Sequence, residues 1–518
     1  MKFGFVNIYP WRPHTEQSLF MADQCRKAGH EVFFLTCRGA LPDCYAREIR
    51  NESRLMGCLK CRLGSFETYN VENVTTLDAE IISNMSNKDS QGLTRSSAAT
   101  LTRIENPEDI DSQAFLEKQS KLDAAVRISF ENAKKWIVDN QLDAVIGFNG
   151  RMDATKAIHA ACQELGVSYI SHERGWFGDG LHLVPNGNCL GLGNLHEMVA
   201  EYANQPLSRK QAEKAADFLM RRISGAQTHE WRLYNVDRQD SEWPAAGSGP
   251  RILILPSSSN EFFAEEELET DWADPTQAMD CLLDQYKGTQ PSVVLRAHPN
   301  WDENIGVASG AKIWDFYSNW AKKRNIHAIN PASKISSQWL MQQADIVVIT
   351  NSTAGMEAGF IGKRVISLAK SQYEGGGFVE SYDSPDAFNA FNPNLEIDER
   401  RIIAGTLRYV YTHQYRYTQF YRSIKAISAS QCHFYEGDVA ERLEQICREG
   451  VIPPSDKTVC DNADEETAFV EALRGSQWRD IVVENAPAIS GEKIKINRKP
   501  LFRWISALRE WFPPGDQK

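Results

Sequence analysis

Three groups of polar residues in the second half of the chain each follow a short apolar run, and their side chains are of types that bind phosphate. Ser257, Ser258 and Ser259 follow RILILP, Arg296 and His298 belong to SVVLRAHPN, and Asn351, Ser352 and Thr353 close DIVVITNST. Hydroxyl groups beside the unpaired N–H groups of a helix N-terminus suit a phosphate. A serine or threonine that merely caps the helix is the alternative reading.

His298 adds an imidazole to this set. Pro299 follows it and ends the strand, which places the ring at the rim of the predicted sheet rather than in the core. There the imidazole could bind a phosphate oxygen and assist a phosphate leaving group. A structural histidine with satisfied hydrogen bonds is the alternative.

Two further positions after Thr353 extend the predicted phosphate site. Glu357 lies about one helical turn beyond Thr353, so its carboxylate could face the same crevice and bind ribose hydroxyls, although a solvent-facing helix glutamate fits equally. Tyr373 opens the run Tyr-Glu-Gly-Gly-Gly-Phe, in which Gly375 and its neighbours would let the backbone approach a ligand. A plain loop is the commoner meaning of such a run.

The first half of the chain offers a candidate general base. Apolar runs there end at Asn149 and Arg151 and at Glu173 and Arg174. A base must reach an acceptor hydroxyl and be ionised, and the neighbouring arginine would favour the charged carboxylate of Glu173. A structural carboxylate paired with arginine is the alternative. Asp153 and Asp179 are weaker candidates for the same role.

These residues are positioned by alternating strands and helices. Short apolar runs separated by helical patterns occur in both halves, as in KFGFVNIY, HEVFFLTC and LDAVIGFNG, and later RILILPSSS, SVVLRAHPN, DIVVITNS and KRVISLAKS. This pattern predicts parallel sheets covered by helices on both faces. Ligands of such sheets bind outside the carboxyl ends of the strands, which is where the polar groups lie.

A chain of 518 residues is too long for one hydrophobic core. We therefore predict an α/β protein with two facing, doubly wound, Rossmann-like domains. The expected divisions are an N-terminal domain over 1–235 with a polar, loop-like insertion at about 62–112, a linker over 236–249, a C-terminal domain over 250–450, and a tail over 451–518.

At these residues the chain resembles the inverting GT-B glycosyltransferases of the capsule-polysaccharide biosynthesis group, the bacterial Kdo transferases and, more distantly, bacterial sialyltransferases and polysialyltransferases. Those families share an acidic residue with glycine, a His-Pro motif and a later Ser-Thr or Ser-Ser pair. The matching segments here are Glu173 to Gly175, His298 with Pro299, and Ser352 with Thr353.

The resemblance implies that His298, Ser352 and Thr353 hold the nucleotide phosphate, that Glu357 lies near the nucleotide, and that Glu173 deprotonates the acceptor. It implies direct displacement at the anomeric carbon without a catalytic metal, with a CMP-sugar as the favoured donor and a glycan or glycolipid as acceptor. A polyol-phosphate transferase, a nucleotide-sugar epimerase and a non-catalytic nucleotide-sugar binding subunit are the alternatives on this fold.

Four of the eleven cysteines have a spacing compatible with a metal site. Cys37, Cys44, Cys58 and Cys61 form C-x6-C-x13-C-x2-C, and a short C-x2-C pair with two further thiols can hold a structural zinc ion. Buried thiols without a metal are the alternative.

The tail and the overall charge bear on partners and location. The segment KIKINRKPLFRWISALREWFPP combines an apolar stripe with basic residues over 493–512, which fits a helix lying on anionic lipid; packing onto the protein itself is the alternative. A net charge of -12 argues against nucleic acid as a partner. With neither a signal peptide nor a membrane-length apolar run in view, we expect a cytoplasmic protein, which the tail could attach to the inner membrane surface.

Overall fold

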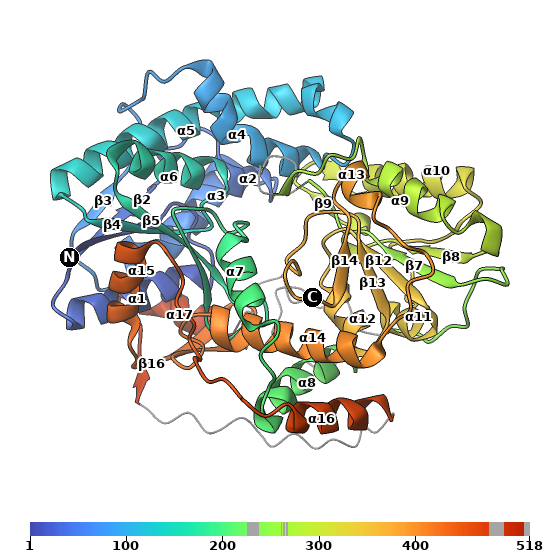
Figure 1. Ribbon diagram of the computed structural model, residues 1–518. Coiled ribbons are helices and arrows are strands. Elements are labelled where there is room, and N and C mark those ends of the chain that lie inside the picture. The colour runs from blue at the N-terminus through green and yellow to red at the C-terminus, as the bar shows by residue number, and fades with distance from the viewer. Residues whose placement is uncertain (225–237, 261, 263–264, 266–267, 476–491, 512–518) are drawn as a thin grey trace.

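The computed structural model contains two six-stranded sheets, each flanked by helices, and describes residues 1–224, 238–260, 262, 265, 268–475 and 492–511 (Figure 1). The strand order is β3-β2-β1-β4-β5-β6 in the first sheet and β11-β8-β7-β12-β13-β14 in the second. Both orders run 3-2-1-4-5-6 in chain sequence, which is the Rossmann arrangement. The prediction of two Rossmann-like α/β domains is therefore confirmed.

The first sheet is parallel except at one edge, where β6 runs antiparallel to β5. Its strands are β1 (Lys2–Asn7), β2 (Glu31–Thr36), β3 (Val74–Thr76), β4 (Ala144–Phe148), β5 (Ser168–Arg174) and β6 (Leu181–Pro185). The helices of this half are α1 (His14–Lys27), α2 (Tyr45–Glu48), α3 (Arg54–Gly64), α4 (Asn87–Thr102), α5 (Gln113–Asn140), α6 (Asp153–Leu165), α7 (Gly193–Tyr202) and α8 (Arg209–Ile223).

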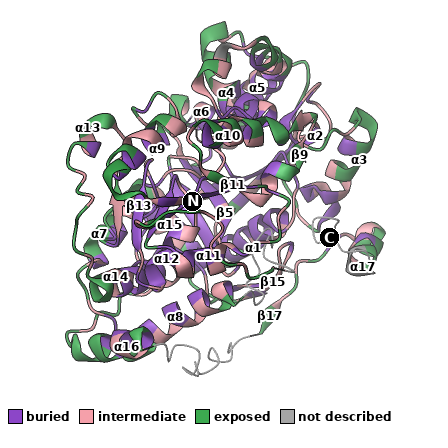
Figure 2. Cartoon of the chain, turned by 90° about the vertical axis from the view of Figure 1, so that its right-hand side faces the viewer, coloured by how far each residue is buried: buried purple, intermediate pink, exposed green. Residues whose placement is uncertain are grey.

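The second sheet is parallel throughout. Its strands are β7 (Arg251–Leu255), β8 (Ser292–Arg296), β11 (His327–Ile329), β12 (Ile346–Ile349), β13 (Arg364–Ser367) and β14 (Val379–Ser381). The helices are α9 (Pro275–Asp284), α10 (Ala311–Lys323), α11 (Ser337–Gln343), α12 (Ala354–Phe360), α13 (Pro385–Phe388) and α14 (Glu399–Tyr411), which continues as a π-helix over Thr412–Tyr417. Every residue of β12 and β13 is buried, as helices on both faces of a sheet require (Figure 2).

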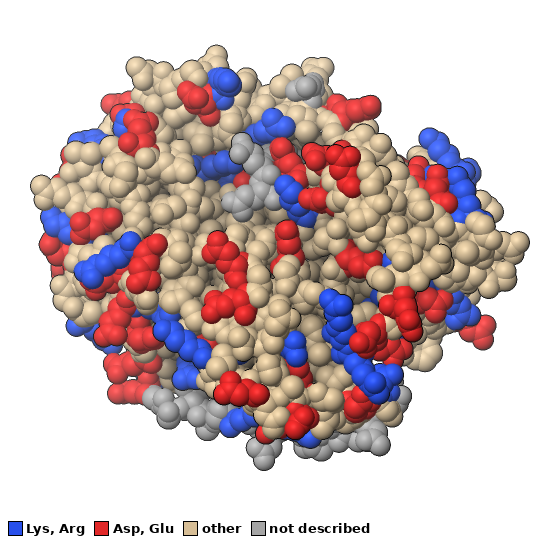
Figure 3. Space-filling model, in the orientation of Figure 1, with Lys and Arg blue, Asp and Glu red and all other residues tan. Residues whose placement is uncertain are grey.

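The remaining elements are short strands and C-terminal helices. They are β9 (Asn304–Ile305), β10 (Ala308–Ser309), β15 (Ile424–Ser428), β16 (Gln431–Tyr435), β17 (Lys493–Ile494), α15 (Val439–Glu449), α16 (Asp464–Arg474) and α17 (Arg503–Trp511). No helix of the described residues is long and apolar enough to span a bilayer. On the face drawn in Figure 3, acidic and basic side chains are interspersed rather than gathered into a basic stripe.

The two halves of the chain exchange segments. Helix α8 packs against α12 and α14 of the second half, whereas α15 packs against α1 and β5 of the first. Phe434 of β16 stacks on Phe20 of α1, with ring centroids 4.9 Å apart. The predicted boundaries at 235 and 450 therefore do not match the packing of two segments. Helix α8 lies within the predicted first domain but packs on the second, and residues 424–449 lie within the predicted second domain but pack on the first.

The predicted loop-like insertion over 62–112 is instead largely structured. It contains β3, which extends the first sheet beside β2, and α4, which packs on α5 and α6. The inward face of α4 includes small polar residues, namely Ser96, Ser97 and Thr100, all buried. Because hydroxyl groups are interspersed with the buried apolar residues Ala98, Ala99 and Leu101, the apolar periodicity that normally predicts a helix is weak. Of the predicted linker, residues 236 and 237 lie outside the described residues.

Candidate functional site

A cavity of about 260 Å³ lies where β7 and β12 end, at the point where the strand order of the second sheet reverses. This is the place where open α/β sheets bind their ligands. Its wall includes Ser257 and Ser259 after β7, Thr350 and Asn351 after β12, and residues 368–370 after β13. Pro107 and Ile110 of the first half close the opposite side. The cavity is therefore built by both halves of the chain.

Hydrogen bonds fix the two loops that meet at this cavity. Thr350 Oγ1 accepts from the Ser257 amide at 2.9 Å, and Ser257 Oγ accepts from the Asn351 amide at 3.2 Å. The Asn351 Oδ1 atom is buried but has no hydrogen-bond partner within the described residues. A buried acceptor that is left unpaired is costly, so this carbonyl is suited to a ligand's N–H or O–H group.

His298 begins the short 3-10 turn Pro299–Asp302 that follows β8. Its Nδ1 accepts a hydrogen bond from the Asn300 amide at 3.2 Å. Because Nδ1 is the acceptor, the proton of the neutral ring is on Nε2, which becomes a donor. Ser258 Oγ accepts from Trp301 Nε1 of the same turn at 2.7 Å. Ser258 thus ties the β7 loop to the His298 turn instead of pointing at a ligand.

The end of the insertion from the first half holds both of these loops. Glu105 accepts from the amide and hydroxyl of Ser259, each at 2.9 Å, and from the Tyr317 hydroxyl at 2.7 Å. Arg103 donates to the carbonyls of Asn300 at 3.0 Å and Glu303 at 2.8 Å. Both side chains are buried. No motif in the sequence marks them, because their partners lie about 150 residues or more away along the chain.

On the opposite side, Glu173 occupies the end of β5 with 23% of its side chain exposed. Asn149 Nδ2 donates to its Oε2 at 3.3 Å, and His14 Nε2 lies 3.2 Å from its Oε1. Burial raises the pKa of the Glu173 carboxyl to about 7, against the opposing effects of Asn149 and of the Arg174 and Arg151 charges. A carboxyl with a pKa near neutrality that keeps some exposure is suited to proton transfer.

His14 is the functional residue that the sequence did not reveal. It begins α1, is 4% exposed, and stacks on Phe148 with ring centroids 4.0 Å apart. Burial, with His172 and Arg174 nearby, lowers the pKa of His14 well below its usual value, so the ring is neutral. Its only sequence signal is a polar residue just beyond the first strand, at the reversal point between β1 and β4.

Asn149 and Arg151 lie together, but in different roles. Asn149 contacts Glu173 directly, with a backbone φ of +67°. The Arg151 side chain is buried and donates to Ser96 Oγ at 2.9 Å and Thr100 Oγ1 at 3.0 Å on α4. Arg151 therefore fixes the loop that carries Asn149.

A second cavity of about 770 Å³ connects the two sides. It is lined by the first half, including Lys88, Arg95, Lys156 and Asn188, and by Glu265 and Glu269 of the second. It shares Ile110 and Glu269 with the cavity beside β7 and β12. Asn188 also lies next to Gly150, which follows Asn149. The two cavities are therefore neighbours that share part of their walls.

Several predicted ligand contacts are instead structural. Arg296 is buried and donates to the carbonyls of Ala297, Asn330 and Ser333 at 2.7–3.0 Å. Tyr373 is 1% exposed, and its hydroxyl donates to the Ser352 carbonyl at 2.8 Å. Gly375, with φ +81°, packs against Ala200 of α7, where an added Cβ would lie 3.2 Å away. These residues shape the loops without facing the cavity.

Glu357 is also engaged within the protein. Its Oε1 accepts from Arg222 of α8 at 2.7 Å, and its Oε2 accepts from Gln338 at 2.7 Å. The carboxylate is buried, so both oxygens are committed to a bridge between the halves rather than to a ribose. Thr353 Oγ1 accepts from Arg222 at 3.2 Å, and Ser352 Oγ accepts from the Ala354 amide at 3.2 Å. That these two hydroxyls also bind phosphate stays a prediction.

The remaining acidic and basic candidates, Asp153, Asp179 and Arg174, make contacts within the protein. Asp153 is fully buried and accepts from the Tyr9 hydroxyl and the Tyr45 amide. Asp179 pairs with Lys425 at 2.6 Å, and Arg174 donates to the Ala429 carbonyl at 3.0 Å. Both contacts join the first half to the β15–β16 hairpin.

The four cysteines of the predicted zinc site gather in one region as thiols. Burial raises the pKa of Cys61 to about 12, and Cys44, Cys37 and Cys58 lie close enough to add to this effect. Among the described residues, no three His, Cys, Asp or Glu side chains are arranged to hold a metal ion. The zinc site stays a prediction, and metal analysis of protein purified without chelator would test it.

Residues 267–421 match the family described as capsule polysaccharide biosynthesis protein. That segment contains the His-Pro motif, Ser352, Thr353 and the part of the cavity wall that follows β12 and β13, so the resemblance of these motifs to the capsule group is confirmed over this part of the chain. No curated protein matches the chain.

Solved structures of low identity share parts of the chain's architecture. A β-Kdo 2,4 transferase, KpsC of Thermosulfurimonas dismutans, is 14% identical, with 52% of this chain and 79% of that chain covered and a TM-score of 0.33. A UDP-GlcNAc 2-epimerase of Neisseria meningitidis bound to UDP-GlcNAc is 13% identical, with 86% and 99% covered and a TM-score of 0.25. The Streptomyces glycosyltransferase SsfS6 is 12% identical, with 80% and 95% covered and a TM-score of 0.21.

Proposed function

We propose that the protein is a glycosyltransferase of capsule or related surface-polysaccharide assembly that takes its sugar from a nucleotide donor. The observation that carries this is the pairing of two features: a cavity at the β7–β12 reversal point, partly lined by the family-matched segment 267–421, and a carboxyl of pKa about 7 on the other half of the chain. The donor would occupy the cavity beside Asn351, and the acceptor would enter through the larger cavity.

The proposed step is a direct displacement. Glu173 takes the proton of an acceptor hydroxyl, whose oxygen forms a bond to the anomeric carbon while the bond from that carbon to the phosphate oxygen breaks. The nucleotide leaves with the electron pair, and the sugar configuration inverts. His14 and Asn149 orient the carboxylate, and the His298 Nε2–H stabilises the charge that develops on the leaving phosphate. This chemistry requires no metal, so activity should persist in EDTA.

A donor panel tests the proposal. The protein is incubated with CMP-, UDP- and GDP-sugars and glycan acceptors, with CMP-linked acidic sugars such as CMP-Kdo tried first, and both released nucleotide and extended glycan are measured. Glu173→Gln should lower kcat by about 10²- to 10⁴-fold with little change in donor affinity. Glu31→Gln, at the exposed start of β2, is the matched control.

Other outcomes would replace the proposal. Conversion of the donor sugar without net nucleotide release would identify an epimerase, and transfer of a polyol phosphate would identify the corresponding transferase. Nucleotide binding without turnover of any donor would leave a binding subunit. A fully active Glu173→Gln variant would remove Glu173 as the base.

A further inference from the structure

Two helices far apart in the sequence expose large apolar side chains. On α3, Leu55 is 79% exposed, Met56 50% and Leu59 47%. At the other end of the chain, Trp504 and Leu508 of α17 are 52% and 48% exposed, and Leu501, in the 3-10 turn directly before α17, is 76% exposed. The two helices lie along the same side of the molecule (Figure 2). Exposed apolar groups gathered in this way mark an interaction surface.

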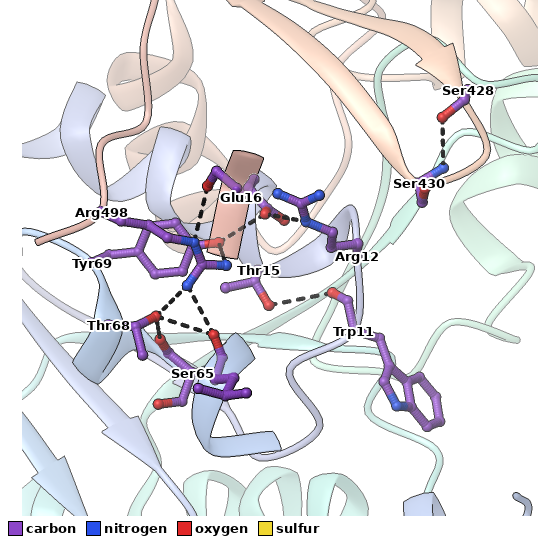
Figure 4. Close-up of polar contacts among 12 residues, drawn as sticks. Trp11, Arg12, Thr15, Glu16, Ser65, Thr68, Tyr69, Ser428, Ser430 and Arg498 are labelled. Carbon is purple, nitrogen blue, oxygen red and sulfur yellow. Dashed lines mark hydrogen bonds and ion pairs between the residues drawn. The ribbon is translucent and has the colours of Figure 1, made fainter. Parts of the chain in front are cut away.

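A buried arginine fixes α17 beside α3. Arg498 is 3% exposed and donates to the carbonyl of Leu63, near the end of α3, at 2.8 Å (Figure 4). It also donates to the Tyr69 hydroxyl at 2.8 Å, and to Ser506 Oγ of α17 at 3.2 Å. Tyr69 in turn donates to Glu16 of α1 at 2.8 Å. Arg498 therefore ties α17 to the C-terminal end of α3.

The backbone reinforces this attachment. The Asn70 amide donates to the Asn497 carbonyl at 3.1 Å, and the Lys499 amide donates to the Thr68 carbonyl at 3.0 Å. Ile505 is 4% exposed, so one side of α17 packs onto the protein while the stripe of Leu501, Trp504 and Leu508 faces outward. Packing onto the protein, one of the two alternatives for the tail, therefore applies to one side of α17. The other side is open to a partner such as anionic lipid.

The surface is basic within an acidic protein. Neither Arg54–Gly64 nor residues 493–508 contain an acidic residue, although the net charge of the chain is -12. Exposed basic residues flank both apolar stripes: Arg54 and Arg62 on α3, where Lys60 is paired with Glu52, and Lys493, Lys495 and Arg503 before and on α17. A second copy of the chain would present the same positive charge and be repelled, whereas an anionic surface would be attracted.

We propose that α3 and α17 together form a docking surface for an anionic lipid bilayer. The apolar stripes enter the interfacial region, where tryptophan is favoured, and the lysines and arginines pair with lipid phosphates. On this proposal, binding to the bilayer requires both helices, whereas the sequence analysis considered only the tail. It is independent of the transfer reaction and is tested without any nucleotide sugar.

Flotation of the full-length protein with vesicles tests the surface. Phosphatidylcholine vesicles with and without 30% phosphatidylglycerol would be compared for wild type, Leu55→Gln/Met56→Gln/Leu59→Gln on α3, and Leu501→Gln/Trp504→Gln/Leu508→Gln on the tail. We expect wild type to bind only the anionic vesicles, and each triple variant to bind at least tenfold more weakly. The matched control is Val138→Gln/Val307→Gln/Leu395→Gln, which changes exposed apolar residues elsewhere and should bind like wild type.

A charge variant tests the electrostatic part of vesicle binding. Lys493→Ser/Lys495→Ser/Arg503→Ser alters only exposed side chains, and each lost charge should weaken binding about fivefold. Unchanged binding by the α3 variant would overturn the composite surface in favour of the tail alone. Absence of wild-type binding, equal binding to neutral vesicles, or a dimer that the triple variants dissociate would overturn the lipid assignment.

Discussion

His14 Nε2 lies 3.2 Å from Glu173 Oε1, which joins the start of the first helix to the end of the fifth strand. The histidine is neutral, because burial and its neighbours lower its pKa. A neutral ring within hydrogen-bonding reach orients the carboxylate without fixing its charge, so the pKa of Glu173 can remain near 7.

The pH dependence of transfer should follow Glu173. The carboxyl must be deprotonated to act as a base, so kcat/KM should rise with pH through about 7 and then reach a plateau. His14 titrates well below this range and should add no second limb there. The measurement is a pH profile of nucleotide release. A rate independent of pH between 5.5 and 8.5 would contradict the assignment.

His298 offers a variant that separates chemistry from folding. His298→Asn keeps an oxygen that can accept from the Asn300 amide, but it lacks the Nε2–H donor. We expect kcat to fall by about 10²-fold at an unchanged melting temperature. His327→Ala, at an exposed position on β11, is the control and should retain full activity. Equal activity of wild type and His298→Asn would exclude a role in leaving-group stabilisation.

Glu105 should make stability depend on pH. Burial raises its folded-state pKa to about 7, above the ordinary value of 4.5, so the charged form is disfavoured in the folded protein. Its contribution is complete below pH 4.5 and is lost as pH rises to 7, by up to about 3 kcal/mol. Urea unfolding at pH 5 and pH 8 should show this loss in wild type and in the exposed control Glu108→Gln, but a smaller loss in Glu105→Gln.

Removing one partner of the Arg222–Glu357 pair should destabilise the fold more than removing both. Both side chains are buried, with N–O distance 2.7 Å. Arg222→Met would leave an uncompensated carboxylate and should lower the free energy of unfolding by about 3–5 kcal/mol. The double variant Arg222→Met/Glu357→Met removes both charges and should recover most of this loss. Additive effects in denaturant unfolding would contradict the pairing.

The sequence predicts the sheets well because their strands are short, continuous apolar runs such as IVVI in β12. It also places Glu173, Asn149 and His298 at strand ends, where the structure has them. Helix α4 escapes prediction, since most of its buried residues are serine and threonine. Arg296, Glu357 and Tyr373 carry the chemistry of ligand-binding residues, but their actual partners come from other loops, and only tertiary structure reveals that the donors and acceptors are already satisfied.

The exchange of segments between the lobes has a consequence for dissecting the molecule. A cut in the connection near residue 249 would separate α8 from the helices it covers and α15 from α1 and β5. Each fragment would expose an apolar face that the other normally shields, so we expect two aggregating pieces instead of two soluble Rossmann units. An isolated first half would need residues 424–449 fused ahead of β1, so that α15 can still cover α1 and β5.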